Sequence, residues 1–153
     1  MNMNYDTLHK QLSSLLESES DMIANMANFS AFIYQNLKNI NWAGFYIRQK
    51  DELVLGPFQG NIACVRIPLG KGVCGVSAAK KQTMLIADVH KFDDHIACDT
   101  ATNSEMVIPI LKEGEVKAVF DIDSPLINRF HHEDKSGLEK IVSTFVSSTN
   151  LIF

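Results

Sequence analysis

Residues Asn41–Arg48 read NWAGFYIR, and here the chain changes from a helical to a strand rhythm. Successive strand side chains point to opposite faces, so Trp42 and Tyr46 share one face and Phe45 lies on the other. Short segments rich in Val, Ile and aromatic residues follow, separated by turn-forming residues. We expect six strands, namely WAGFYIR 42–48, ELVLGPF 52–58, ACVRIPL 63–69, TMLIADV 83–89, MVIPILK 106–112 and EVKAVFDID 115–123.

Helices are expected in the sequence before the first of these strands and after the last. Asp6 is the expected N-cap of TLHKQLSSLLE, and Ser20 or Asp21 precedes the more apolar MIANMANFSAFIYQNL. A glycine-rich entry to a short helix follows the third strand, and a last helix begins near Glu133. The turns QKDE and KEGE predict hairpins. We therefore expect an α+β fold: one domain over residues 1–153, with a six-stranded, mainly antiparallel sheet and terminal helices packed on one face.

The composition is that of an ordinary globular domain, with 46% hydrophobic and 21% charged residues. A net charge of −4 gives no reason to expect nucleic acid or an anionic membrane as a partner. The first residues lack the pattern of a secretory signal, and no run is long and apolar enough to span a membrane. We expect a cytoplasmic protein, in which three cysteines do not form a standing disulfide framework.

Strand parity also selects candidate site residues. Asp121 and Asp123 share one face of their strand, opposite Phe120 and Ile122. Both this aspartate pair and the aromatic pair Trp42 and Tyr46 also have a structural interpretation. The aromatic side chains could simply pack, and the aspartates could be solvated or cap a turn. Both pairs nevertheless fall on the face turned away from the helices, where we expect a ligand pocket. The long segment 88–104 is the expected cover of that pocket, and it carries Cys98.

The other two cysteines have different surroundings. Cys64 is expected on a strand, on the same face as Arg66. Cys74 lies at the start of an expected helix, where the helix dipole and free amides favour a thiolate. Cys98 is followed by Asp99, and a nearby carboxylate makes a thiolate harder to form. Local electrostatics therefore predicts Cys74 as the reactive thiol.

Two other kinds of site were considered. A metal site could draw on histidines and a cysteine, but their spacing matches no CxxC, HxxxH or HExxH pattern, and we expect none. A serine hydrolase is disfavoured because no GxSxG elbow occurs. The residues weighed as metal ligands are His90, His95, Cys98, His131 and His132.

Several motifs together resemble one family. NWAGFY, GPFQG, ACVRIPLGKGVCG, DVHKFDDHIACD, SEMVIPI and VFDIDSP look like the GAF-domain free methionine-(R)-sulfoxide reductases, and the likeness spans about residues 5–150. The cysteine separations of 10 and 24 residues set this group apart from other GAF domains. The resemblance implies a single GAF domain that reduces the free amino acid methionine-R-sulfoxide, with thioredoxin as electron donor.

The resemblance also implies roles for individual residues. Cys98 becomes the catalytic cysteine, Cys64 the resolving cysteine that forms a disulfide with it, and Cys74 an auxiliary redox residue. No cofactor is bound, because NADPH supplies electrons through thioredoxin reductase and thioredoxin. Family likeness further implies a homodimer through the N-terminal helices. The implied substrate pocket consists of Trp42, Tyr46, Glu105, Asp121 and Asp123.

Two alternatives from other classes remain open at this point. A small-molecule-sensing GAF module is favoured by NRF at Asn128–Phe130, which is similar to the start of a motif in cyclic-nucleotide-binding GAF domains. A thiol redox sensor would use disulfide formation alone as its signal. Turnover of the free sulfoxide with thioredoxin distinguishes the enzyme from both.

Overall fold

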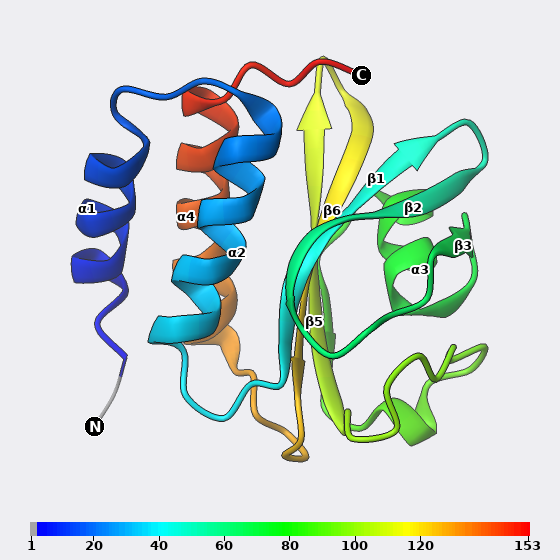
Figure 1. Cartoon of the computed structure of the whole chain (residues 1–153). Coiled ribbons are helices and arrows are strands. Elements are labelled where there is room, and N and C mark those ends of the chain that lie inside the picture. Colours follow the sequence, from blue (N-terminus) through cyan, green and yellow to red (C-terminus); the bar gives the residue numbers. More distant parts are fainter. Residues whose placement is uncertain (1–2) are drawn as a thin grey trace.

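The computed structural model describes residues 3–153, which form a sheet with helices on both of its sides (Figure 1). The expected domain of residues 1–153 therefore includes two residues, 1 and 2, that lie outside the described part. In chain order the elements are α1 (Tyr5–Leu16), α2 (Met22–Asn36), β1 (Trp42–Gln49), β2 (Glu52–Gly60), β3 (Arg66–Pro68), α3 (Gly72–Lys80), β4 (Met84–Ile86), the short 3₁₀ helix η1 (Val89–Lys91), β5 (Ser104–Lys112), β6 (Glu115–Ser124) and α4 (His132–Ser148).

The sheet has the strand order β3-β2-β1-β6-β5-β4, and every neighbouring pair is antiparallel. Both expected hairpins are present. In the β5–β6 hairpin Lys112 pairs with Glu115, and the two turn residues Glu113 and Gly114 both have positive φ. This backbone matches the twist of the strands and is favourable for glycine at the second position. The predicted α+β fold with a six-stranded antiparallel sheet is confirmed.

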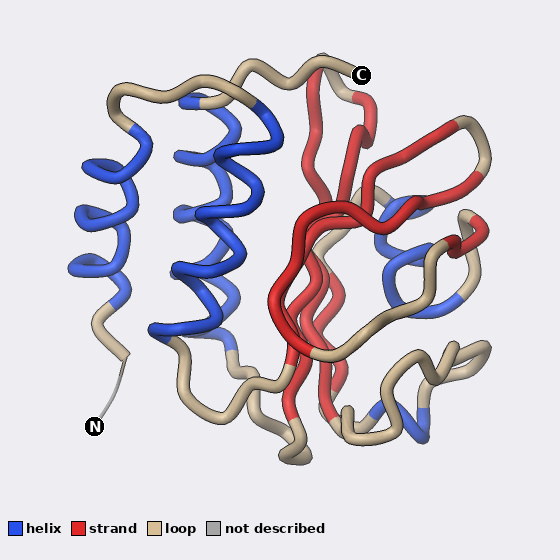
Figure 2. The backbone as a smooth tube through the Cα atoms, in the orientation of Figure 1, coloured by secondary structure: helices blue, strands red, loops and turns tan. Residues whose placement is uncertain are grey.

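One face of the sheet packs against α2 and α4, and α1 lies outside these two helices, farthest left in Figures 1 and 2. Four phenylalanines from α2, β1, β6 and α4 form the centre of this core, with ring centroids 4.8–5.6 Å apart. Alternation along β1 and β6 places Phe45 and Phe120 here, so strand parity predicted the core face correctly. The four rings belong to Phe29, Phe45, Phe120 and Phe145.

The opposite face holds a second, smaller core under α3, into which Trp42 and Tyr46 point. In Figure 2 this face also carries the loops before β3 and before β5, far from the three packed helices. Gly75 brings α3 close to β3, because a Cβ there would press against the Pro68 carbonyl. The separation of the two faces is what creates room for a site.

Two of the expected strands are shorter than predicted. The expected strand 63–69 contracts to Arg66–Pro68, so Cys64 lies in the loop before β3. The expected strand 83–89 contracts to Met84–Ile86. In the loop before β3, the Asn61 and Cys64 carbonyls accept hydrogen bonds from the Trp42 and Tyr46 side chains, and these bonds replace strand pairing.

The start of the first helix was also misplaced. Asn4, and not Asp6, is its N-cap, because the Asn4 side chain accepts the Thr7 amide at 3.0 Å. Asp21 is confirmed as the cap of α2. Among residues 3–153, no helix combines the length and apolar character that crossing a bilayer would require.

Candidate active site

Three acidic side chains gather on the sheet face away from the packed helices. Glu105 comes from β5, and Asp121 and Asp123 come from the neighbouring β6. The register places Glu105 directly opposite Asp123, so the two side chains share a face with Asp121 next along its strand. Glu105 and Asp121 are only 7% and 6% exposed. The strand register thus concentrates negative charge in a largely dry site.

Aromatic rings form the wall beside the acidic residues. Trp42 pairs across the strands with Asp123 and Gly44 with Asp121, so β1 brings Trp42 next to the carboxylates. The Trp42 ring stacks on Tyr46 at 5.8 Å and on Phe58 at 5.1 Å between centroids. Phe58 was not predicted as a site residue from the sequence. It lies opposite Gly44 in the β1–β2 ladder.

Gly44 is required for this stack. A Cβ at Gly44 would lie 2.8 Å from Trp42 Cη2 and would also collide with the Phe58 side chain. Real Cβ atoms do not approach other heavy atoms this closely. The glycine in NWAGFY therefore leaves the space in which the three rings meet.

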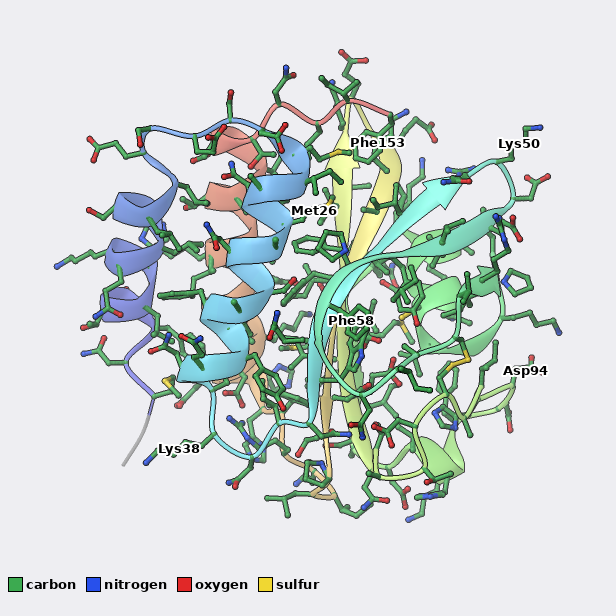
Figure 3. The ribbon with its side chains drawn as sticks, viewed as in Figure 1. Met26, Lys38, Lys50, Phe58, Asp94 and Phe153 are labelled. Carbon is green, nitrogen blue, oxygen red and sulfur yellow. A yellow bond between two sulfur atoms is a disulfide. The ribbon has the colours of Figure 1, made fainter. Side chains whose placement is uncertain are left out.

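A disulfide joins Cys64 to Cys98 across the mouth of the site, with their Cα atoms 5.3 Å apart. It links the loop before β3 to the loop before β5, and in Figure 3 it lies on the side of the labelled Asp94, across the sheet from Met26. The Tyr46 hydroxyl donates to the Cys64 carbonyl at 2.9 Å and fixes that loop. The pairing that the family resemblance implied is therefore present.

The closed disulfide leaves a cavity of about 40 Å³ between the loops and the sheet. Seven of the eight residues that the sequence predicted as site residues line this cavity. They are Trp42, Tyr46, Cys74, Cys98, Glu105, Asp121 and Asp123. The eighth, Cys64, is not a lining residue but is bonded to Cys98, which is.

Asn41 is a residue that sequence analysis missed. Its side-chain amide donates to Asp99 Oδ2 at 3.3 Å and to Thr102 Oγ1 at 3.2 Å. Its backbone amide donates to the Asp123 carbonyl at 2.9 Å. Asn41 thus ties the segment that carries Cys98 to the end of β6. No local pattern could reveal it, because its partners lie about 60 residues away in the chain.

Burial makes the acidic residues hold protons more tightly. Desolvation raises the pKa of Asp121 to about 6, while hydrogen bonding from its neighbours opposes part of that rise. Desolvation and then repulsion from Asp121 raise the pKa of Glu105 well above its ordinary value. Asp123 is raised by the same two causes. Burial and mutual repulsion therefore favour the protonated form of the carboxyl groups in this cluster.

The surroundings of Cys74 are the opposite of those from which local electrostatics predicted a reactive thiol. It lies in the first turn of α3 but is 3% exposed, and desolvation followed by repulsion from Asp121 and Glu105 raises its pKa. Its sulfur lies 3.8 Å from Glu105 Oε1. Burial beside carboxylates outweighs the helix dipole, because the dipole contributes at most a few kcal/mol near the helix end.

Several oxygens in the site lack a protein hydrogen-bond donor. Among residues 3–153, the buried Asn41 Oδ1, Asp121 Oδ1 and Asp123 Oδ1 have no hydrogen-bond partner. Buried acceptors are costly when unpaired, so the site suits a ligand that brings its own donors. The ligand atoms of Cys74, Glu105 and Asp121 also lie within 4.8 Å of one another, as a small cation would need. The absence of a metal site stays a prediction.

Of the histidines weighed as metal ligands, His95 lines the cavity, whereas His131, His132 and the NRF segment lie elsewhere. His131 and His132 are exposed at the start of α4, where His131 caps the helix. Phe130 is buried in the main core, and Arg129 forms an ion pair with Asp134 at 3.4 Å. In this structure, Arg129 and Phe130 of the NRF segment therefore have structural roles, one in an ion pair and one in the core.

Comparison with known proteins places this architecture in a family. The GAF domain model matches residues 6–148. The "Free methionine-R-sulfoxide reductase" of Escherichia coli (strain K12) is 50% identical over 139 residues, which cover 91% of this chain and 84% of that protein.

Solved structures agree over nearly the whole chain. The reduced form of fRMsr of Staphylococcus aureus superposes with a TM-score of 0.93 and 49% identity, covering 96% of both chains. The complex of the same protein with its substrate gives a TM-score of 0.92 and 48% identity, covering 97% of both chains. With the family model matched over residues 6–148 and 50% identity over 91% of the chain, the chain belongs to the GAF domain family and, within it, to the free methionine-R-sulfoxide reductases.

Proposed function

We propose that this protein reduces free L-methionine-(R)-sulfoxide to L-methionine through a sulfenic acid on Cys98 and a disulfide with Cys64. The observation that carries the proposal is the position of the Cys64–Cys98 disulfide, which closes a cavity lined by three acidic side chains and an aromatic wall. A redox-active sulfur beside a protonated carboxyl group is the pair that sulfoxide reduction needs.

The lining suits the free amino acid. The unpaired Asp121 and Asp123 oxygens would accept from the substrate ammonium, whose charge they complement. Trp42 and Tyr46 would contact the methyl group and the sulfur, which carries partial positive charge and is attracted to a π-face. Backbone amides of the Cys98 loop or of the Gly72–Gly75 turn would bind the substrate carboxylate. Methionine within a peptide has neither free charge, so we expect it to be excluded.

The proposed chemistry runs in two steps. The Cys98 sulfur attacks the sulfoxide sulfur while Glu105 donates a proton to the sulfoxide oxygen, and the oxygen passes to Cys98 as methionine is released. The products are methionine and a Cys98 sulfenic acid. The Cys64 thiol then attacks that sulfenic acid, a disulfide forms, and the oxygen leaves as water.

The disulfide state resembles the end of a catalytic cycle. A volume of about 40 Å³ accommodates about three water molecules, at the roughly 10–15 Å³ that each needs, and an amino acid is several times larger. The disulfide therefore leaves no room for the next substrate. Reduction would free the loops at Cys64 and Cys98 to separate and reopen the site.

Thioredoxin is the proposed reductant, with electrons from NADPH through thioredoxin reductase. Its dithiol would reduce the disulfide to two thiols and itself become oxidised, so each cycle consumes one dithiol and releases one water. No bound cofactor is required by this scheme. The two steps do not involve Cys74, for which we propose an auxiliary redox role. We also propose that the protein is a homodimer, formed through its N-terminal helices.

Two cysteine substitutions test the scheme. Cys98→Ser should abolish turnover, because the nucleophile is lost. Cys64→Ser should release about one methionine per site and then stop, because the sulfenic acid cannot be resolved. Methionine release is measured by rapid quench, with the S epimer and a sulfoxide-bearing peptide as control substrates. Normal cycling of Cys98→Ser with thioredoxin would overturn the proposal.

The same assay separates the alternatives. A mixture of thioredoxin, thioredoxin reductase and NADPH reports turnover as NADPH oxidation. Consumption with only the free R form supports the reductase. No consumption with any substrate favours a sensing module or a thiol redox sensor, neither of which turns the sulfoxide over.

A further inference from the structure

We propose that the exposed side chains of Ile62 and Val65, on either side of Cys64, form the docking surface for a thioredoxin-class dithiol protein. This inference rests on the proposed function, because it names the surface through which the proposed disulfide would be reduced. The surface begins at the rim of the cavity, which Ile62 helps to line, and extends outward to Val65, which is not a lining residue.

Both side chains are unusually open to solvent. Ile62 is 91% exposed and Val65 is 61% exposed, whereas Ile67 at the start of the adjacent core is only 5% exposed. Single exposed aliphatic residues are common and need no explanation. Here two of them bracket a disulfide cysteine in the sequence, and the residue between Ile62 and Cys64 is the apolar Ala63. The result is an apolar surface centred on the bond to be reduced.

The backbone beneath this surface is fixed. The Trp42 indole donates to the Asn61 carbonyl at 3.1 Å. The Tyr46 hydroxyl donates to the Cys64 carbonyl at 2.9 Å, and the Leu55 amide donates to the Val65 carbonyl at 2.9 Å. Three hydrogen bonds within five residues hold the segment against β1 and β2. These bonds hold the backbone that presents the side chains of Ile62 and Val65 to solvent.

The charged residue nearest to Cys64 in the sequence is paired. Arg66, the residue after Val65, forms an ion pair with Glu52 on β2. Charges that are paired on the surface contribute little long-range attraction, and salt screens what remains. A partner that binds here is selected by apolar contact, and its association is only weakly dependent on ionic strength.

The chemistry of the bond specifies the partner. A thiolate of the partner attacks one sulfur of the Cys64–Cys98 disulfide and forms a mixed disulfide, releasing the other cysteine as a thiolate. The second thiol of the partner then attacks the mixed disulfide, so the partner leaves oxidised and both cysteines are reduced. A protein dithiol whose own rim is apolar can place its thiolate at this half-buried bond and cover Ile62 and Val65.

Comparing a protein reductant with a small one tests the surface. We expect Val65→Ser to lower kcat/KM for thioredoxin about tenfold, because an apolar contact at the centre of a small interface is lost. Cycling driven by dithiothreitol and first-turnover methionine release should stay unchanged. Ile62→Ser, like Val65→Ser, should lower the ratio of the thioredoxin-driven rate to the dithiothreitol-driven rate. Salt between 50 and 300 mM should change the parent's thioredoxin-driven rate by less than about threefold.

The control is Ile152→Ser, which removes a 68% exposed isoleucine near the C-terminus and should leave the ratio unchanged. A ratio within twofold of the parent for both Val65→Ser and Ile62→Ser would overturn the docking surface. Failure of the parent to release methionine in its first turnover would instead contradict the proposed function, so the two failures are distinguishable.

Discussion

Replacing Asp121 with asparagine should make the protein more stable and less active. Asp121 is 6% exposed, and one of its carboxylate oxygens has no hydrogen-bond partner among residues 3–153. Asparagine has nearly the same shape but no charge. The substitution therefore removes the cost of burying an ionised group while keeping the packing of β6.

The pKa of Asp121 gives the size of this effect. Burial raises that pKa from 3.8 to about 6. Each unit is worth about 1.36 kcal/mol, so ionised Asp121 lowers the free energy of unfolding by about 3 kcal/mol above pH 6. Between pH 3.8 and about pH 6 the folded state keeps a proton on Asp121 that the unfolded state has released, so the parent loses stability as pH rises.

Asp121→Asn should therefore match the parent near pH 3.8 and exceed it above pH 6. Burying the amide offsets part of the gain, so we expect about 1–3 kcal/mol at pH 8. At about 2–4 °C per kcal/mol, the melting temperature would rise by roughly 2–12 °C.

Urea denaturation of the disulfide-closed protein between pH 4 and pH 8 measures the difference. Asp93→Asn, on an exposed loop residue, is the matched control and should change stability by less than about 0.5 kcal/mol. An Asp121→Asn protein that is no more stable than the parent at pH 8, or whose advantage does not grow with pH, would refute the reasoning. In the same variant kcat/KM for the sulfoxide should fall at least tenfold, since the proposed contact to the substrate ammonium is lost.

Three further predictions follow from the site. Glu105→Gln should lower kcat about 100-fold, the usual scale for a general acid, and a change within twofold would remove Glu105 from that role. Gly44→Ala should cost about 1–3 kcal/mol of stability, measured by thermal denaturation, because its Cβ would press on Trp42 and Phe58. Asn41→Ala should lower kcat/KM about tenfold with a small change in melting temperature, since the Cys98 segment loses two hydrogen bonds; unchanged kinetics would show that these bonds do not position the loop.

Much of the fold was predictable because it depends on short-range periodicity. The alternation in NWAGFYIR and in VFDID placed Phe45 and Phe120 in the main core and turned Trp42 to the other face. Turn chemistry predicted the two hairpins. Strand ends were not predictable in the loop before β3, where side chains of β1 take the carbonyls that strand pairing would have used. Competition between side-chain and main-chain partners cannot be read from a local pattern.

The sequence by itself determined which residue types face the site, because side-chain direction in a strand follows from the period of two. It also supplied the likeness that assigned roles to Cys64 and Cys98. The tertiary structure alone decided the surroundings of Cys74. Cys74 begins a helix and should ionise by local rules, yet packing buries it beside Asp121 and Glu105 and raises its pKa. Desolvation and repulsion depend on neighbours that the fold brings together from 31 residues away and more, and no local pattern contains them.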